Sequence, residues 1–130
     1  MMIDETASPH DFETTCKRLT DAVAANGFGL LHTHDIHATL NSKGVDFAPE
    51  CRVFEVCNPR QAAEILAGRL DLSNALPCRI AVYEQDGRAQ VSMIRPTELL
   101  AQLATDDKLA GVARDVEASM DQMIRETVAT

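Results

Sequence analysis

The dipeptide Asp86-Gly87 constrains the fold of this chain more than any other feature. It stands between two β-prone runs, residues 79–84 and 88–94. Asp-Gly suits a tight turn in which both central residues take positive φ angles, and such turns join antiparallel strands. The apolar residues of the first run must then share a buried face with alternate residues of the second. We therefore predict an antiparallel hairpin, and with it a sheet, in the second half of the chain.

Helix starts are marked by proline at the first helical position, where its missing N–H group costs no hydrogen bond. This pattern predicts helices that begin at Pro9, Pro59 and Pro96, the first two capped by Ser8 and Asn58. Residues in the first turn support the first two of these starts. In the first helix, Asp11 carries a negative charge, which the positive end of a helix stabilises. In the second helix, Gln61 stands three residues after Asn58, the position at which a capping box has glutamine or glutamate.

Capping residues and periodicity predict the remaining elements. Asp35 caps a short helix that closes at Gly44, and Thr105-Asp106-Asp107 begins a last helix over about residues 106–128. Strands are predicted over residues 28–34 and 51–57, with an edge strand over residues 1–6.

The order of these elements points to one α+β domain. The chain has 130 residues, of which 45% are hydrophobic, so one continuous core should bury roughly two-thirds of the surface of the unfolded chain. No repeat or composition shift marks a linker. We expect a single two-layer domain over residues 1–130, with a small mixed or antiparallel sheet and helices packed on one face.

Charge and composition exclude several classes of function. Lys and Arg number 12 against 20 Asp and Glu, which gives a net charge of −8. Such a chain repels nucleic-acid phosphates and anionic lipids, so neither nucleic acid nor membrane is expected as a partner. The N-terminus lacks the basic start and apolar stretch of a secretory signal, which predicts a cytoplasmic protein. The four cysteines should therefore be free thiols.

Two cysteine motifs carry a family resemblance. The segments Cys57-Asn58-Pro59 and Leu76-Pro77-Cys78, together with Gly27-Phe28-Gly29, Val82-Tyr83-Glu84 and Pro96, resemble a prokaryotic family known as domain of unknown function three hundred and two. The resemblance covers roughly residues 11–103. It implies a compact α+β fold, a tendency to form homodimers and no established activity. It also implies that the two cysteine motifs share a pocket.

Cys57 has the sharpest chemical setting of the four cysteines. It directly precedes a predicted helix start, where the free N–H groups and the dipole favour a thiolate. We therefore predict a lowered pKa for Cys57 if its sulfur faces the helix start that Asn58 and Pro59 define. The competing interpretation is packing, because a small side chain often fills a strand-to-helix corner. The pocket that we predict near these motifs has Cys57, Asn58, Pro59, Pro77 and Cys78 as its candidate ligand-binding residues.

Three histidines form a second candidate site. Period two places His32 and His34 on one strand face, which begins with Phe28 and Leu30, and His37 opens the next helix. Two imidazoles about 7 Å apart can hold one metal ion, so His32, His34 and His37 are candidate ligands for Zn²⁺ or another transition metal. The alternative is that the rings cap the edge of the core and bond to water or backbone.

Three functions remain open from the sequence. The leading hypothesis is a small-ligand or metal-binding domain with its pocket near Cys57 and Cys78. The second is a thiol redox or metal-handling enzyme that uses these two cysteines, and the third is an interaction module without pocket chemistry. A homodimer is expected, because the apolar stripe of the last helix exceeds what one small sheet can cover. That stripe comprises Leu109, Val112, Ala113, Val116, Met120, Met123 and Ile124.

Overall fold

The predicted hairpin is present in the computed structural model. Asp86 and Gly87 have φ angles of 55° and 76°, and they join β4 (Cys78–Gln85) to β5 (Arg88–Ile94) in antiparallel register. Ile80 and Val82 of β4 are fully buried, and they lie opposite Met93 and Val91 of β5, which are also buried. The alternation of apolar residues therefore sets the register, as the turn requires.

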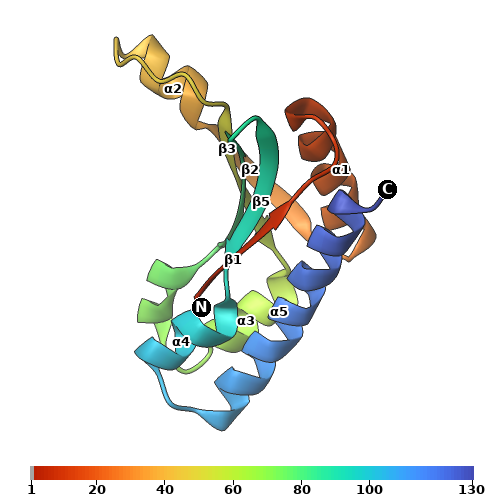
Figure 1. Cartoon of the computed structure of the whole chain (residues 1–130). Coiled ribbons are helices and arrows are strands. Elements are labelled where there is room, and N and C mark those ends of the chain that lie inside the picture. The colour runs from red at the N-terminus through yellow and green to blue at the C-terminus, as the bar shows by residue number, and fades with distance from the viewer. Residues whose placement is uncertain (1) are drawn as a thin grey trace.

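Five strands form one antiparallel sheet in the order β1-β5-β4-β3-β2 (Figure 1). The structure describes residues 2–130. The expected edge strand exists as β1 (Ile3–Ala7), although Met1, which the prediction included, lies outside the described residues. The other two strands are β2 (Gly29–Asp35) and β3 (Cys51–Cys57). The α+β class is confirmed, with every strand pair antiparallel.

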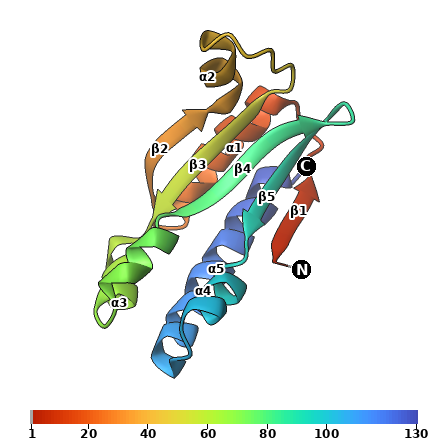
Figure 2. The ribbon, with the colours of Figure 1, turned by 90° about the vertical axis from the view of Figure 1, so that its left-hand side faces the viewer.

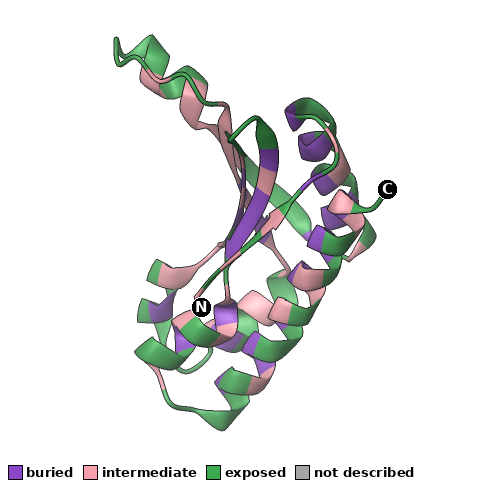
Figure 3. Ribbon diagram, in the orientation of Figure 1, coloured by how far each residue is buried: buried purple, intermediate pink, exposed green. Residues whose placement is uncertain are grey.

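The helices leave one face of the sheet open. Figure 2 shows α1 (Phe12–Ala25) and α5 (Asp107–Val128) behind the sheet, and no helix of residues 2–130 covers the face toward the viewer. α3 (Pro59–Leu66), α4 (Pro96–Leu103) and a 3₁₀ turn (Leu70–Ala75) gather at one end of the sheet. The short α2 (Ile36–Ser42) stands off at the other end and buries no residue (Figure 3).

The core lies between the sheet and the two long helices. Leu19 and Val23 of α1 pack in one cluster with Met120 and Met123 of α5 and with the inward residues of the strands. All seven residues of the predicted apolar stripe on α5 are buried within this one copy of the chain. The stripe therefore gives no reason to expect a second copy. Homodimer formation stays a prediction from the family resemblance, which the mass of the particle in solution tests.

The start of the first helix was predicted wrongly. Ser8 does not cap it and Pro9 does not open it, because α1 begins at Phe12 and Asp11 is its cap, with an Asp11 carboxylate oxygen accepting from the Thr14 N–H at 2.7 Å. The Ser8 hydroxyl is buried instead and bonds to the Thr15 hydroxyl at 2.8 Å. Ser8 and Asp11 are both residue types that cap helices, and the charged carboxylate of Asp11 forms the stronger cap.

The other helix starts were predicted correctly. Pro59 and Pro96 open α3 and α4, and Asp35 and Asp106 cap α2 and α5 through their carboxylates. None of the helices in residues 2–130 is long and apolar enough to span a lipid bilayer.

Candidate functional site

The two cysteine motifs meet at the end of the sheet where α3 and α4 begin. Cys57 is the last residue of β3, and Cys78 is the first residue of β4. Val56 pairs with Cys78 in the sheet, which places Cys57 beside Cys78. Both cysteines line one small cavity of about 20 Å³. The sheet register thus brings together two motifs that are about twenty residues apart in the chain.

The walls of this small cavity are mostly apolar. Its polar lining consists of the two cysteines, Asn58 and Gln61, and the remaining walls come from Phe28, Val56, Ala62, Ile65, Leu76, Pro77 and Val116. The Asn58 side chain is occupied as the cap of α3, since its Oδ1 accepts the Gln61 N–H at 3.1 Å. The predicted capping box is therefore only half formed. Gln61 Oε1 is buried and has no hydrogen-bond partner among the described residues.

The segment Leu76-Pro77-Cys78 also lines a second, larger pocket. Its volume is about 230 Å³, and residues from the 3₁₀ turn, β4, β5, α4 and the loop between the turn and β4 line it: Asn74, Ala75, Leu76, Pro77, Cys78, Arg79, Ile94, Pro96, Leu99 and Leu100. Of the five predicted binding residues, Pro77 and Cys78 line both the larger pocket and the small cavity. Cys57 and Asn58 line only the small cavity, and Pro59 lines neither. Sequence reasoning missed Ile94 and Leu99, because only the folded sheet brings β5 and α4 to this loop.

Burial makes both thiols weaker acids than an exposed cysteine. It raises the pKa of Cys57, and it raises the pKa of Cys78 from its ordinary 9.0 to about 11, with a smaller contribution from the charge of Cys57. The predicted lowering of the Cys57 pKa is therefore wrong. The start of α3 lies next to Cys57 in sequence, but the cause that sets the direction of the pKa is the removal of the thiol from water. All four cysteines are free thiols, as expected.

These pKa directions predict slow alkylation. At pH 7.5 Cys78 should react with iodoacetamide about 100-fold more slowly than a cysteine in an unstructured peptide, since its thiolate fraction falls tenfold per pKa unit. Cys57 should also react more slowly than the peptide, and the Cys78 rate should keep rising between pH 9 and pH 11. Mass spectrometry of tryptic peptides gives each rate. The same protein in urea is the control, and a Cys57 rate above that of the peptide would contradict the direction.

A bulge in β2 changes the face on which the histidines lie. Leu30 pairs with Val56 and His32 with Glu55, which leaves Leu31 as an extra residue without a partner in β3. Leu31 is 59% exposed. A bulge shifts the alternation by one residue, so His32 leaves the face that Phe28 and Leu30 occupy. The prediction that all four side chains share one face is therefore wrong, although His32 and His34 still share a face with each other.

His32 and His34 form a pair on the open face of the sheet. Their ring centroids are 4.4 Å apart and the ring planes meet at 69°. His34 Nε2 lies 3.1 Å from Glu55 Oε2, and Arg79 contacts the same carboxylate at 3.4 Å. Glu55 is thus shared between an imidazole and a guanidinium. An arginine this close disfavours a divalent cation at the carboxylate.

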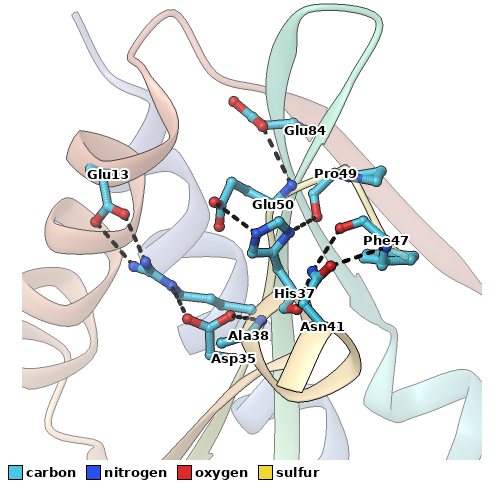
Figure 4. A network of polar contacts seen from close by, with 10 residues as sticks. Glu13, Asp35, His37, Ala38, Asn41, Phe47, Pro49, Glu50 and Glu84 are labelled. Atoms are coloured by element: carbon cyan, nitrogen blue, oxygen red, sulfur yellow. Dashed lines mark hydrogen bonds and ion pairs between the residues drawn. The ribbon is translucent and has the colours of Figure 1, made fainter. Parts of the chain in front are cut away.

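His37 belongs to a separate network at the base of α2. Figure 4 shows its ring between Pro49 and Glu50: Nδ1 donates to the Pro49 carbonyl oxygen at 3.0 Å, and Nε2 lies 3.7 Å from Glu50. In residues 2–130 no three or more His, Cys, Asp and Glu side chains are grouped so that they could hold a metal ion. The three histidines therefore do not form one preassembled set of ligands.

Comparison with known proteins agrees with the geometry of the fold. One solved structure, described as the crystal structure of an uncharacterized conserved protein DUF302 from Bacillus stearothermophilus, superposes with a TM-score of 0.91 at 29% sequence identity, covering 98% of each chain. No curated protein matches this chain. The model of the family described as "Domain of unknown function DUF302" matches residues 4–127, almost the whole chain. The chain therefore belongs to the DUF302 family.

Proposed function

We propose that this protein is a small-molecule binding domain whose ligand occupies the 230 Å³ pocket beside Leu76-Pro77-Cys78. The observation that carries the proposal is the pocket itself, which collects residues from the end of β5, the start of β4 and α4 around one loop. Pockets at the ends of strands, where several elements meet, are common ligand sites. The pocket also contains Pro77 and Cys78, two residues of the motif that carries the family resemblance.

The lining defines the class of ligand. Seven of the ten lining residues are apolar, and the polar ones, Asn74, Cys78 and Arg79, can contact the edge of a bound molecule. Sites for drug-sized molecules have volumes of about 300–1,000 Å³, so this pocket suits a smaller compound. A single aromatic ring or a short aliphatic chain with one polar group fits these properties.

Ligand-observed NMR tests the proposal with indole, p-cresol and 1-heptanol as probes. We expect saturation transfer from the protein to at least one probe, with a dissociation constant below about 1 mM. Leu99→Glu should abolish the transfer, because it places a carboxylate in an apolar pocket. The matched control is Leu103→Glu, since Leu103 lies on the same helix, is 44% exposed and does not line the pocket.

Two outcomes would overturn the proposed function. One is the absence of transfer to all three probes, and the other is equal transfer in the Leu99→Glu and Leu103→Glu variants. A melting temperature for Leu99→Glu close to that of the control shows that the variant is folded. The redox alternative gains no support from the thiols, because burial raises both pKa values and an active thiol needs the opposite direction.

A further inference from the structure

The charge of the 230 Å³ pocket comes from one residue. Arg79 is the only charged residue among the described residues that line the pocket, and no aspartate or glutamate is among them. The other two polar lining residues are neutral: Asn74 is an amide, and burial raises the pKa of the Cys78 thiol to about 11. A bound cationic group would therefore meet an arginine and no carboxylate. The lining favours an anionic group on the ligand.

The pocket borders the open face of the sheet at the end where α4 begins (Figure 2). Ile80 of β4 and Met93 of β5 are paired and buried, so they point to the side that the helices cover. Their chain neighbours Arg79 and Ile94 point the other way, because side chains alternate along a strand. Arg79 and Ile94 both line the pocket. A ligand held there can therefore reach the open face with one end.

The Arg79 guanidinium lies over this open face. Arg79 pairs with Glu55 of β3, and Glu55 pairs with His32 of β2, which sets the three side chains in one row across the sheet. One terminal nitrogen of Arg79 is 3.4 Å from a Glu55 carboxylate oxygen, its only ion pair within residues 2–130. The Arg79 side chain is 64% exposed. Most of the donors of the guanidinium are thus available to a second carboxylate.

We propose that the pocket selects a small carboxylic acid in its ionised form. The apolar body of the ligand packs against Pro96, Leu99 and Leu100, and its carboxylate pairs with the Arg79 guanidinium at the open face. A guanidinium donates two parallel N–H groups to one carboxylate, a contact that an alcohol of the same size cannot form. This inference rests on the small-molecule function proposed above, because it names the ligand class of the same pocket.

The net charge of the chain makes the role of Arg79 testable. A charge of −8 repels anions in general, and salt at physiological concentration screens this repulsion beyond about 8 Å. A carboxylate that binds more tightly than its neutral counterpart must therefore touch a cation directly. Without Arg79 the preference should disappear, since no other charged residue of the described chain lines the pocket.

NMR titration at pH 7.5 and 0.15 M salt tests the proposal with three matched pairs of probes. Indole, p-cresol and 1-heptanol each have a carboxylate counterpart, which are indole-3-carboxylate, p-toluate and heptanoate. We expect the carboxylate of at least one pair to bind about tenfold more tightly than the neutral probe, as for a hydrogen bond to a charged group. Heptylamine, a cation with the same chain length, should bind more weakly than 1-heptanol.

Two variants assign the preference to Arg79. In Arg79→Gln the carboxylates should bind no more tightly than their neutral partners, whereas the affinity for the neutral probes should change by no more than about twofold. Arg88→Gln is the matched control, because Arg88 is exposed, pairs with Gln85 beside the hairpin turn and does not line the pocket. It removes the same charge from the chain and should keep the tenfold preference.

His34 provides a readout that needs no variant. His34 Nε2 is 3.1 Å from the same Glu55 carboxylate that Arg79 contacts, so a ligand that draws Arg79 away changes the surroundings of the His34 ring. His37 belongs to the separate network with Pro49 and Glu50. In carbon-13 correlation spectra of the histidine rings, the carboxylate probes should shift the His34 signals and leave those of His37 unchanged.

Three results would overturn this inference. They are neutral probes that bind as tightly as their carboxylates, a preference that Arg88→Gln removes as fully as Arg79→Gln, and a His37 shift as large as that of His34. If no neutral probe binds, the small-molecule function itself fails. If the neutral probes bind and the carboxylates are no tighter, only the inferred ligand class fails, so the two failures are distinguishable.

Discussion

Replacement of Leu19 with alanine is expected to lower the free energy of unfolding by about 2–5 kcal/mol. Leu19 is fully buried on the face of α1 that packs against the sheet and α5. Its truncation removes transfer free energy and leaves a cavity, because close-packed neighbours relax only in part. For a two-state domain of this size, urea unfolding followed by circular dichroism measures the loss directly.

Leu70→Ala is the matched control for this substitution. The substitution removes the same atoms at a position that is 78% exposed, so the free energy of unfolding should change by no more than about 0.5 kcal/mol. An equal loss in the two variants would show that α1 does not pack as described. An unchanged midpoint for Leu19→Ala would show the same.

The elements that sequence predicted well are those fixed by neighbouring residues. Asp86-Gly87 determines its own turn, and each of Asn58, Asp35 and Asp106 lies within three residues of the N–H group that it caps. Interactions over so few residues need no tertiary information. The wrong cap at Ser8 follows from the same limit. The Ser8 hydroxyl forms a buried hydrogen bond with the Thr15 hydroxyl, and this pair becomes buried only when α1 packs against the rest of the chain.

The position of the histidines could not be read from periodicity. One extra residue, Leu31, in β2 is enough to move His32 and His34 to the opposite face, and no residue type in the run Leu30-Leu31-His32 signals a bulge. A strand pattern assumes unbroken alternation, so a single insertion reverses every side chain after it. The bulge depends on how β2 pairs with β3, which is information that the local sequence lacks.

The candidate site was predicted in part, for a similar reason. The family resemblance implied that Cys57 and Cys78 share a pocket, and the pairing of Val56 with Cys78 is the contact that achieves it. The pKa of Cys57 was predicted in the wrong direction, because the helix start is a local feature, whereas burial of the thiol depends on how the whole chain folds. Gln61 was interpreted only as a capping residue, and its orphaned oxygen is a property of the packed cavity.

The second large effect is expected where α1 holds the end of α5. Arg18 donates to three backbone carbonyl oxygens: Nε to Thr127 at 2.8 Å, and one terminal nitrogen to Glu126 and to Ala129, each at 2.9 Å. The last carbonyls of a helix have no partner within the helix, and a cation there also favours the negative end of the dipole. Arg18→Met should therefore lower the free energy of unfolding by about 1.5–3 kcal/mol, the range for hydrogen bonds to charged groups.

Lys17→Met separates this capping role from the simple loss of a positive charge. Lys17 is the neighbouring cation on α1, but its side chain is exposed and makes an ion pair with Asp21, so its removal should cost about 0.5 kcal/mol or less. Hydrogen exchange locates the effect, since only Arg18→Met should speed exchange of the backbone amides in the last turn of α5. Equal losses of stability in the two variants would show that the loss of a positive charge explains the effect. Unchanged exchange in Arg18→Met would show that the three contacts between Arg18 and the carbonyl oxygens do not stabilise the end of α5.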